Sequence, residues 1–470
     1  MNQPTPQVPD PKGSFRDSIS TITKEGKRNW IYPKKPKGKL YDRRTILSFF
    51  FLGALFAGPF LKVNGHPLML FNVLERKFII FGIAFWPQDF HLFVLAMLTF
   101  IVFIILFTAL FGRLWCGWAC PQTIFMEMVF RKIEYMIEGD YMQQKSLDAE
   151  SKNPKKIRKK LLKNSIFFLL SFLIANTFLA YIIGIDELQH IIFDDPALHI
   201  GGLISIIVFT AVFYGVYTKF REQACIVVCP YGRLQGVLLD KNSVVIGYDY
   251  KRGEPRGKLH KGEERKNGDC IDCHQCVHVC PTGIDIRNGT QLECVNCSAC
   301  IDACDDIMDK IEKPRGLIRY TSEDAIATGA KFKVTTRIIG YSIVLSILLG
   351  TLVWLIATRN DVEATILRTP GMLWQEQSGN KVSNLYNVKI VNKTFHELPI
   401  DIQIVSPEGQ VKWIGTGVTK LKEQDISEGE FFIILDKSII KTTKTKLRIK
   451  VMSNNKVVDE TETNFIGPTN

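Results

Sequence analysis

The sequence contains no isolated cysteine, although it has twelve cysteines in 470 residues. They form four short clusters: Cys116 and Cys120; Cys225 and Cys229; Cys270, Cys273, Cys276 and Cys280; and Cys294, Cys297, Cys300 and Cys304. A disulfide-stabilised exported domain would spread its cysteines along the chain, whereas this close spacing brings several thiolates within reach of one metal centre. The pattern therefore excludes a disulfide scaffold and favours metal ligation.

The first forty residues also lack the apolar run that a signal peptide needs. Residues 1–44 are instead polar and rich in Pro and Lys, so we expect a disordered, basic cytoplasmic tail. The net charge is +12, but much of the excess lies in this tail and around residues 155–160. Basic runs beside apolar segments fit membrane topology and lipid head groups, so no nucleic-acid partner is expected.

Five apolar stretches approach or reach the roughly 20 residues that an α-helix needs to cross a bilayer. They are residues 45–61, 91–111, 165–185, 198–217 and 338–357, of which the first is the shortest. The apolar run 78–86 is too short to span a bilayer, so we expect an interfacial or re-entrant segment there.

Lys and Arg are absent from the connection 186–197, whereas residues 24–44 hold nine and residues 112–164 hold eleven. Because basic residues stay on the cytoplasmic side, the amino terminus is expected to lie inside the cell. Five crossings then place both Cys-x3-Cys pairs and the eight-cysteine segment on the cytoplasmic side, and the chain after residue 357 in the periplasm.

A weak internal repeat accompanies this helix count. Arg113 and Arg221 each follow an apolar run and precede a Cys-x3-Cys-Pro motif, and His91 and His199 lie at matching places near the outer ends of two helices. Two roles remain open for these histidines: ligation of copper or of a haem, or an ordinary position at the membrane interface.

The exported tail, residues 359–470, is rich in β-formers. Segments 385–392, 398–405, 430–435, 446–452 and 457–465 are separated by turn residues at intervals typical of a sandwich. We expect an immunoglobulin-like β-sandwich without a disulfide, serving as a docking or stabilising module.

The eight remaining cysteines have the x2-x2-x3 spacing of a dicluster ferredoxin. In such proteins the first three cysteines of each run hold one [4Fe-4S] cluster and the fourth holds the other. The predicted ligand sets are Cys270, Cys273, Cys276 and Cys304 for the first cluster, and Cys294, Cys297, Cys300 and Cys280 for the second. Paired structural zinc sites rarely repeat this spacing. His274 and His278 are expected to be solvated or to support the ligands.

The two Cys-x3-Cys-Pro motifs can each present two sulfurs from one helix face. Pro121 and Pro230 suit a first helical turn, which would place Cys120 and Cys229 at helix amino termini, where thiolate is favoured. Three interpretations remain for the four thiols: a copper site, because soft thiolates select Cu(I); a redox dithiol or a contact with the clusters; and a structural zinc site.

The sequence therefore predicts a multi-domain membrane protein with a five-helix transmembrane bundle, a cytoplasmic dicluster ferredoxin-like insert and a C-terminal immunoglobulin-like β-sandwich. The predicted divisions are 1–44 for the tail, 45–235 for helices one to four, 236–336 for the insert, 337–358 for helix five and 359–470 for the periplasmic domain.

The ordered set of motifs resembles the CcoG/FixG/RdxA family of cytochrome oxidase accessory proteins. The set comprises both Cys-x3-Cys-Pro motifs, the stretch Arg252-Gly-Glu-Pro-Arg-Gly257, the eight-cysteine segment and the β-rich tail. The resemblance covers most of the chain. Ferredoxin spacing is widespread, and Cys-x3-Cys-Pro also resembles membrane ferredoxins of the NapH and NosR type. The resemblance therefore depends on the combination of the motifs, on their order and on the lack of an added flavin-binding domain.

The resemblance implies a cupric reductase of the bacterial inner membrane that makes Cu(I) for the copper centre of a cbb(3)-type cytochrome c oxidase. Oxidase subunits or copper chaperones would be its partners, together with an unidentified electron donor. Reduction of Cu(II) is a one-electron step, which suits iron-sulfur clusters. Two other functions remain open: a quinol-linked electron-transfer subunit of a partner redox enzyme, and a non-catalytic assembly scaffold.

Overall fold

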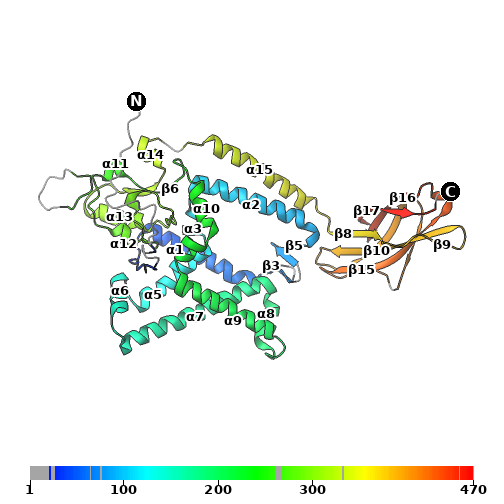
Figure 1. Ribbon diagram of the computed structural model, residues 1–470, viewed down its shortest axis with the longest axis horizontal. Helices are drawn as coiled ribbons and strands as arrows, with labels where there is room; N and C mark the ends of the chain where they lie inside the picture. Colours follow the sequence, from blue (N-terminus) through cyan, green and yellow to red (C-terminus); the bar gives the residue numbers. More distant parts are fainter. Residues whose placement is uncertain are drawn as a thin grey trace. The chain divides into compact units, whose positions relative to one another are not determined.

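The computed structural model describes residues 21–22, 27–63, 65–74, 77–259, 267–330, 333–415, 417–454 and 456–468. The chain divides into two units (Figure 1). The first unit comprises Met1–Gly58, Ala96–Ala180 and Ile185–Leu349, and the second comprises Pro59–Leu95, Tyr181–Gly184 and Gly350–Asn470.

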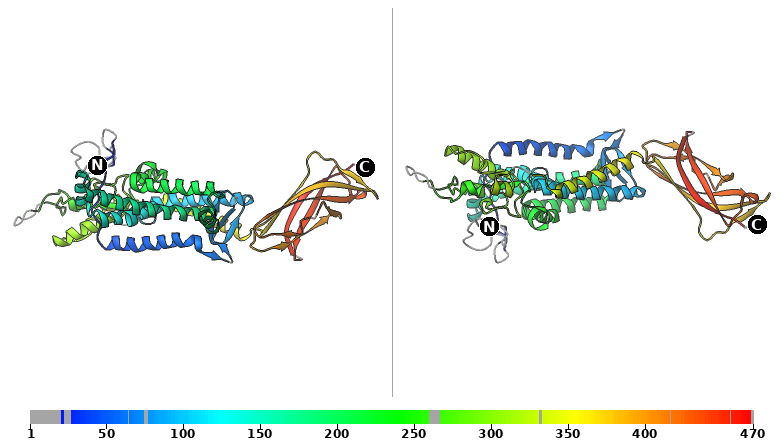
Figure 2. Two further views of the ribbon diagram at one scale, coloured as in Figure 1. Left: turned by 90° about the horizontal axis from the view of Figure 1, so that it is seen from below. Right: turned by 90° about the horizontal axis from the view of Figure 1, so that it is seen from above.

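Four helices in the described ranges are long and apolar enough to cross a membrane: Pro87–Phe111, Pro154–Ile183, Ile200–Phe220 and Thr336–Ala357. The first includes α2 (Phe90–Phe111), the second is α7, the third joins α9 (Ile200–Gly215) to a short π-helix, and the fourth is α15. A helix satisfies its own backbone hydrogen bonds, as lipid requires. The chain is therefore a membrane protein with four of the five predicted spans, and Figure 1 shows α7 and α9 crossing each other in the first unit. Figure 2 shows the same helices from two further sides.

The remaining predicted span corresponds to α1, Lys39–Ala57, which begins earlier than expected. Its first turns carry Lys39, Asp42, Arg43 and Arg44. The uncharged part covers only residues 45–57, about 20 Å of helix at 1.5 Å per residue, against a hydrocarbon core of about 30 Å. The count of five spans therefore stays a prediction.

The predicted disordered tail differs from the structure where the structure describes it. Residues 1–20 and 23–26 lie outside the described residues. In residues 27–44, Tyr32 Oη donates to Asp148 Oδ2 at 2.6 Å and Arg28 contacts Glu222 at 2.9 Å. The backbone nitrogen of Tyr41 donates to Asp302 at 2.8 Å. This basic segment has defined partners because carboxylates of the first unit neutralise or accept hydrogen bonds from it.

The ferredoxin-like insert is closed by a two-stranded sheet. Strand β6 (Val245–Tyr248) pairs antiparallel with β7 (Ile318–Thr321), so the ends of the cysteine-rich segment meet. Between them lie α12 (Gln275–His278) and α13 (Ala299–Lys310). Apolar side chains of these elements form one core with six of the eight cysteines, and Cys270 and Cys276 are buried in it.

The carboxyl-terminal part of the second unit has two main antiparallel sheets around one core, and a further two-stranded sheet made by β11 (Leu398–Pro399) and β14 (Lys420–Leu421). One sheet has the order β13-β15-β10-β8 with β9 beside β10, and the other has the order β12-β16-β17. Their bounds are β8 Val362–Arg368, β9 Gln375–Gln377, β10 Lys381–Asn392, β12 Asp401–Ser406, β13 Gln410–Trp413, β15 Ile426–Asp436, β16 Lys444–Ser453 and β17 Lys456–Ile466. Tyr386, Phe431, Ile449 and Phe465 are fully buried between the sheets. All five predicted strand segments are confirmed, whereas β8, β9 and β13 were not predicted.

The apolar run 78–86, expected to be an interfacial or re-entrant segment, forms strands. Strands β3 (Met69–Asn72), β4 (Lys77–Ile80) and β5 (Ile83–Phe85) make a three-stranded meander. Phe81 and Gly82 both have positive φ, 50° and 76°, as a two-residue type I′ hairpin requires. The turn lies inside the apolar run, which conceals it in the sequence.

A buried ion cluster joins this meander to the sandwich within the second unit. Asp89, which follows β5 and is 3% exposed, contacts Lys393 at 2.7 Å and Arg359 at 3.0 Å. Arg359 also donates to the carbonyl of Ala84 at 2.6 Å. The Asp89 carboxylate therefore pairs with two cations, Arg359 shortly before the sandwich begins and Lys393 within it.

We predict that Asp89→Asn will destabilise the second unit by about 1–3 kcal/mol, because buried Arg359 loses its carboxylate partner, whereas Lys393 keeps Glu363 at 2.8 Å. Hydrogen exchange of the full chain in detergent will show the loss as faster exchange in β3–β5 and β8. Glu428→Gln is the control, since its exposed pair with Lys389 at 2.8 Å contributes about 0–1 kcal/mol. Equal exchange in both variants would contradict the anchoring role.

Candidate metal centres and thiol site

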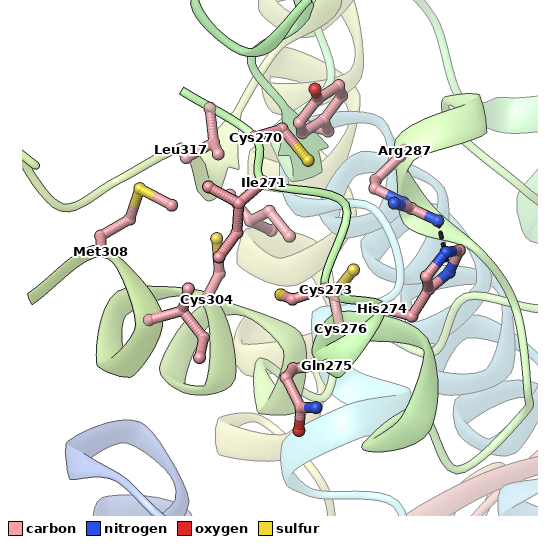
Figure 3. A pocket seen from close by; sticks show the side chains of 13 residues that line it. Cys270, Ile271, Cys273, His274, Gln275, Cys276, Arg287, Cys304, Met308 and Leu317 are labelled. Carbon is pink, nitrogen blue, oxygen red and sulfur yellow. Dashed lines mark hydrogen bonds between the residues drawn. The ribbon is translucent and has the colours of Figure 1, made fainter. Parts of the chain in front are cut away.

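Four cysteines from two separate runs line one cavity of the insert, called the first cavity. Cys270, Cys273 and Cys276 come from the first run, and Cys304 comes from the end of the second (Figure 3). Cys273 is exposed, whereas Cys270 and Cys276 are buried. The first predicted ligand set is therefore gathered around a single space.

The other set lines the second cavity. Cys294, Cys297 and Cys300 of the second run meet Cys280, the last cysteine of the first run, and Cys276 borders both cavities. The exchange of the fourth cysteine is the crossed arrangement that the spacing predicts. The two cavities share a wall, so groups held in them would be close neighbours.

The backbone of the two runs repeats the same turns. Asp272 and Asn296, each two residues after the first cysteine of its run, have φ of 53°. His274 and Ser298, four residues after that cysteine, have φ of 54° and 64° and precede α12 and α13. Asn and Asp tolerate this left-handed conformation better than most residues. Each run therefore curls around its cavity before a helix begins.

The cysteine environment suits an iron-sulfur group. Burial raises the pKa of Cys294 and Cys304 to about 12 and that of Cys297 to about 11. Such thiols ionise when a bound metal supplies compensating positive charge. Among the described residues, no three His, Cys, Asp or Glu side chains converge on a single metal ion. Four cysteines around each cavity are the donor set that a [4Fe-4S] cluster takes.

Sequence reasoning missed Arg287, a buried neighbour of the first cavity. It contacts Asp272 at 2.5 Å and Asp285 at 2.6 Å, and its Nη2 lies 2.8 Å from His274 Nδ1 (Figure 3). His274 thus supports the loop of the first run. A supporting role was one of the two that the sequence predicted for this residue. His278 stacks on Tyr141, with ring centroids 5.6 Å apart.

The Cys-x3-Cys-Pro motifs have the predicted local structure. Cys120 is the N-cap of α4 (Pro121–Thr123), and Cys229 is the N-cap of α10 (Pro230–Leu238), each followed by Pro in the first turn. Cys116 lies in α3 (Leu114–Trp118) and Cys225 in a short π-helix, Ala224–Val228.

All four of these thiols come together in the first unit. Burial raises the pKa of Cys225 to about 12, and the charges of Cys120, Cys116 and Cys229 add to the rise. The other three thiols therefore lie within electrostatic range of Cys225. They are not arranged as a ready single-ion site in the described chain, and nothing in the arrangement shows a copper ion.

Helix α3 lies directly against the second cavity. Cys116 shares a buried cluster with Val295 and Cys297. A Cβ on Gly117 would come within 2.4 Å of the Val295 carbonyl oxygen and 2.7 Å of that of Asn296. Only glycine permits this approach, which sets the thiol group beside the loop that carries Cys294 and Cys297.

Gln235 of α10 links the thiol site to a buried arginine. Its Oε1 accepts from Arg113 Nε at 2.7 Å and from the Cys116 thiol at 3.4 Å. Burial raises the pKa of Cys116 to about 11, while Arg113 opposes the rise. Neither contact follows from a sequence pattern, because Gln235 lies 119 residues from Cys116.

The structure shifts the alignment of the internal repeat. The residue four positions before the first cysteine has positive φ in both copies: 56° at Gly112 and 52° at Arg221. Arg113 therefore corresponds to Glu222, and the two copies carry opposite charges at this position. Arg221 donates both guanidinium nitrogens to Glu134, at 2.9 and 2.8 Å.

The histidines of the repeat have different surroundings. His199 Nε2 lies 3.7 Å from Asp194, which also contacts His190 at 3.1 Å. His91 is exposed on α2. A haem or copper role for His91 and His199 stays untested.

Three family models match the chain. Residues 220–323 match a 4Fe-4S dicluster domain, residues 93–135 match a 4Fe-4S binding domain, and residues 352–468 match the IG-like fold at the C-terminus of FixG. Protein RdxB of Cereibacter sphaeroides is 33% identical over 405 residues, which cover 81% of this chain and 83% of RdxB. The chain belongs to the FixG/RdxA family.

Two further family members match over a shorter range. Protein RdxA of Cereibacter sphaeroides is 37% identical over 298 residues, 62% of each protein. Nitrogen fixation protein FixG of Rhizobium meliloti is 36% identical over 307 residues, which cover 63% of this chain and 58% of FixG. The chain thus spans less than two thirds of RdxA and FixG. As a FixG/RdxA protein it has 4Fe-4S domains and an IG-like C-terminal domain.

We predict that Cys280→Ser will chiefly impair the cluster of the second cavity and Cys304→Ser that of the first, because each cysteine lines the cavity of the opposite run. Iron analysis and EPR of the anaerobically purified variants will measure the effect, and each variant is the control for the other. The crossed assignment fails if each substitution affects only the cluster of its own run.

Proposed function

We propose that the protein reduces Cu(II) to Cu(I) for assembly of the copper centre of a cbb(3)-type cytochrome c oxidase. The observation that carries this proposal is the buried cluster that Cys116 shares with Val295 and Cys297, together with the close approach of Gly117 to the backbone of Val295 and Asn296. The substrate ion would meet the thiols of Cys116, Cys120, Cys225 and Cys229.

The eight cysteines of the insert would hold two [4Fe-4S] clusters, which supply single electrons when bound. Apolar side chains around both cavities exclude water from them. A reductant outside this chain provides the electrons, and the exposed Cys273 marks the part of the first cavity nearest to solvent.

The thiol site suits the product of the reaction. Soft thiolates prefer Cu(I) to harder ions. Four thiolates would bind the cation more tightly than one pair. Since burial raises the pKa of Cys116 and Cys225, binding of copper must release protons. Copper affinity is therefore expected to fall as the pH decreases.

We also propose that α1 is the fifth span. Its first turn contacts Asp302 of the insert through Leu40 and Tyr41. After α1 the chain forms the meander and then α2. The carboxyl end of α2 reaches the insert, where Gly112 lies against Asn296. Because α2 crosses the membrane and ends at the insert, the meander lies on the opposite side, and α1 must cross to reach it.

By the distribution of Lys and Arg, the insert is cytoplasmic, and the meander and sandwich are periplasmic. Leu74→Cys in the turn after β3 should therefore react with a membrane-impermeant thiol reagent in spheroplasts. Val237→Cys on α10 is the control, because the native side chains are equally exposed, at 82% and 81%. It should react only after the membrane is permeabilised. An unlabelled Leu74→Cys in intact spheroplasts would exclude a crossing by α1.

The copper assignment predicts a separation of functions. Paired Ser substitutions at Cys116 and Cys120, or at Cys225 and Cys229, remove soft ligands while all eight cluster cysteines stay in place. Each double variant should retain its iron content and cluster EPR signal, but lose bound copper and Cu(II)-reducing activity. Metal analysis and a reductase assay on the same preparation will measure both properties.

Two other outcomes would count against copper at this site. A structural zinc site predicts that membrane yield and iron content fall together, because loss of a four-thiolate site destabilises the fold. Unchanged copper reduction in well-folded variants of both pairs would exclude these cysteines from the reaction.

A further inference from the structure

A cleft of about 1070 Å³ opens beside the first cavity, within the first unit, and is called the basic cleft. Gln275 and Ile307 line both the basic cleft and the first cavity. In Figure 3 the side chain of Gln275 points away from the cysteine sulfurs, and its Oε1 accepts a hydrogen bond from Lys34 Nζ at 2.9 Å. A redox group in the basic cleft would therefore be separated from a cluster in the first cavity by little more than these two residues.

Most of the lining comes from two elements, the segment 34–43 and helix α13. The backbone nitrogen of Lys34 donates to the carbonyl of His278 at 2.7 Å, and that of Tyr41 donates to Asp302 at 2.8 Å. Both ends of the basic segment are thus held against the insert by backbone hydrogen bonds. These contacts fix the position of the segment without using the charged ends of its lysines.

Basic residues outnumber acidic residues in the lining. The basic ones are Lys34, Lys35, Lys37, Lys39, Arg43, Lys310 and Arg315, and the acidic ones are Asp140, Asp302, Asp305, Asp306 and Asp309. Two of the carboxylates have a cation of the lining beside them: Asp306 pairs with Lys310 at 2.6 Å, and Asp309 pairs with Arg315 at 2.6 Å. The basic residues of the segment 34–43 do not take part in either pair.

The three other carboxylates, Asp140, Asp302 and Asp305, are buried or half-buried. Each accepts a hydrogen bond from a backbone nitrogen, at distances between 2.8 and 3.0 Å. Asp42 is exposed on α1 but does not line the basic cleft. By contrast, four cations of the lining are exposed and form no ion pair with the part of the chain that the structure describes: Lys35, Lys37, Lys39 and Arg43. The unpaired charge that a partner meets in the basic cleft is therefore positive.

We propose that the basic cleft docks a small, soluble, acidic electron-carrier protein, which passes one electron to the cluster of the first cavity. The reduced centre of the carrier loses one electron and the cluster gains it, and no bond forms or breaks. Negative charge around the redox group of the carrier would complement the four exposed cations and speed the encounter. Anionic lipid head groups would also attract these cations, but the shared wall with the first cavity favours an electron donor. This inference rests on the bound clusters of the proposed function and not on copper as the acceptor.

The test is the rate at which a reduced, acidic plant-type ferredoxin reduces the clusters of the anaerobically purified full-length protein, followed by stopped-flow absorbance without copper. The triple variant Lys35→Gln, Lys37→Gln and Lys39→Gln should lower this rate about tenfold at low ionic strength, because electrostatic steering raises association rates by about 10-fold to 1000-fold. The difference from wild type should shrink as salt is added.

The control variant combines Lys152→Gln, Lys155→Gln and Arg158→Gln. It removes the same charge from three exposed residues that do not line the basic cleft, and it should keep the wild-type rate. The methyl viologen radical cation provides a second control, because a small cationic donor gains nothing from basic side chains. It should reduce the clusters of both triple variants as fast as those of the wild type.

Asp309→Asn tests the opposite sign and also serves if the lysine variant does not retain its clusters. It releases Arg315, which is 53% exposed, so ferredoxin should react faster and with a stronger dependence on salt. An unchanged ferredoxin rate in the lysine variant would overturn the proposal and leave these lysines to lipid head groups. An equal loss in the control variant, or an equal loss with viologen, would overturn it as well. Reduction of the wild-type clusters by viologen tests the clusters of the proposed function separately from docking.

Discussion

The close contact at Gly117 is the constraint on which the arrangement of the thiol site depends. The backbone of α3 approaches the carbonyls of Val295 and Asn296 so closely that no side chain fits between them. This contact joins a helix that follows a membrane span to the loop of the second cysteine run. Cys116 consequently shares its buried surroundings with Cys297, although the two are far apart in the sequence.

Charge compensation divides the first unit into two regions. Near Cys225, buried ions are paired: Arg221 with Glu134 at 2.8 Å, and Arg131 with Glu222 at 3.4 Å. Such pairs add little net stability but are costly to break, because one buried charge would remain alone. On α1, buried Arg44 forms no ion pair with the part of the chain that the structure describes, and its Nε and Nη2 have no hydrogen-bond partner there.

The sequence predicted those features that depend on local spacing. The eight cysteines and their crossed grouping follow from the x2-x2-x3 pattern, and the N-caps at Cys120 and Cys229 follow from the next residue being Pro. The apolar spans follow from length and composition. The hairpin at Phe81 and Gly82 was missed because its strands are as apolar as a membrane segment, so periodicity alone does not distinguish them.

Features that depend on long-range contacts had no such signal. Arg44 lies within the basic segment before the first apolar run, where Lys and Arg are common, and only the fold shows that it is buried while Arg43 is exposed. Likewise, Gln235 is an ordinary helical residue until the fold places its carbonyl oxygen between Arg113 and Cys116.

The corrected repeat explains why the two thiol pairs are not equivalent. Equal φ at Gly112 and Arg221 aligns Arg113 with Glu222, so one copy has an arginine where the other has a carboxylate. Arg113 opposes the burial effect on Cys116, whereas Cys225 has three thiols among its neighbours and a higher pKa, about 12 against about 11. The two buried thiols thus have different polar surroundings, although both begin a Cys-x3-Cys-Pro motif: Cys116 lies beside Gln235 and Arg113, whereas the charges that act on Cys225 are those of the other three thiols.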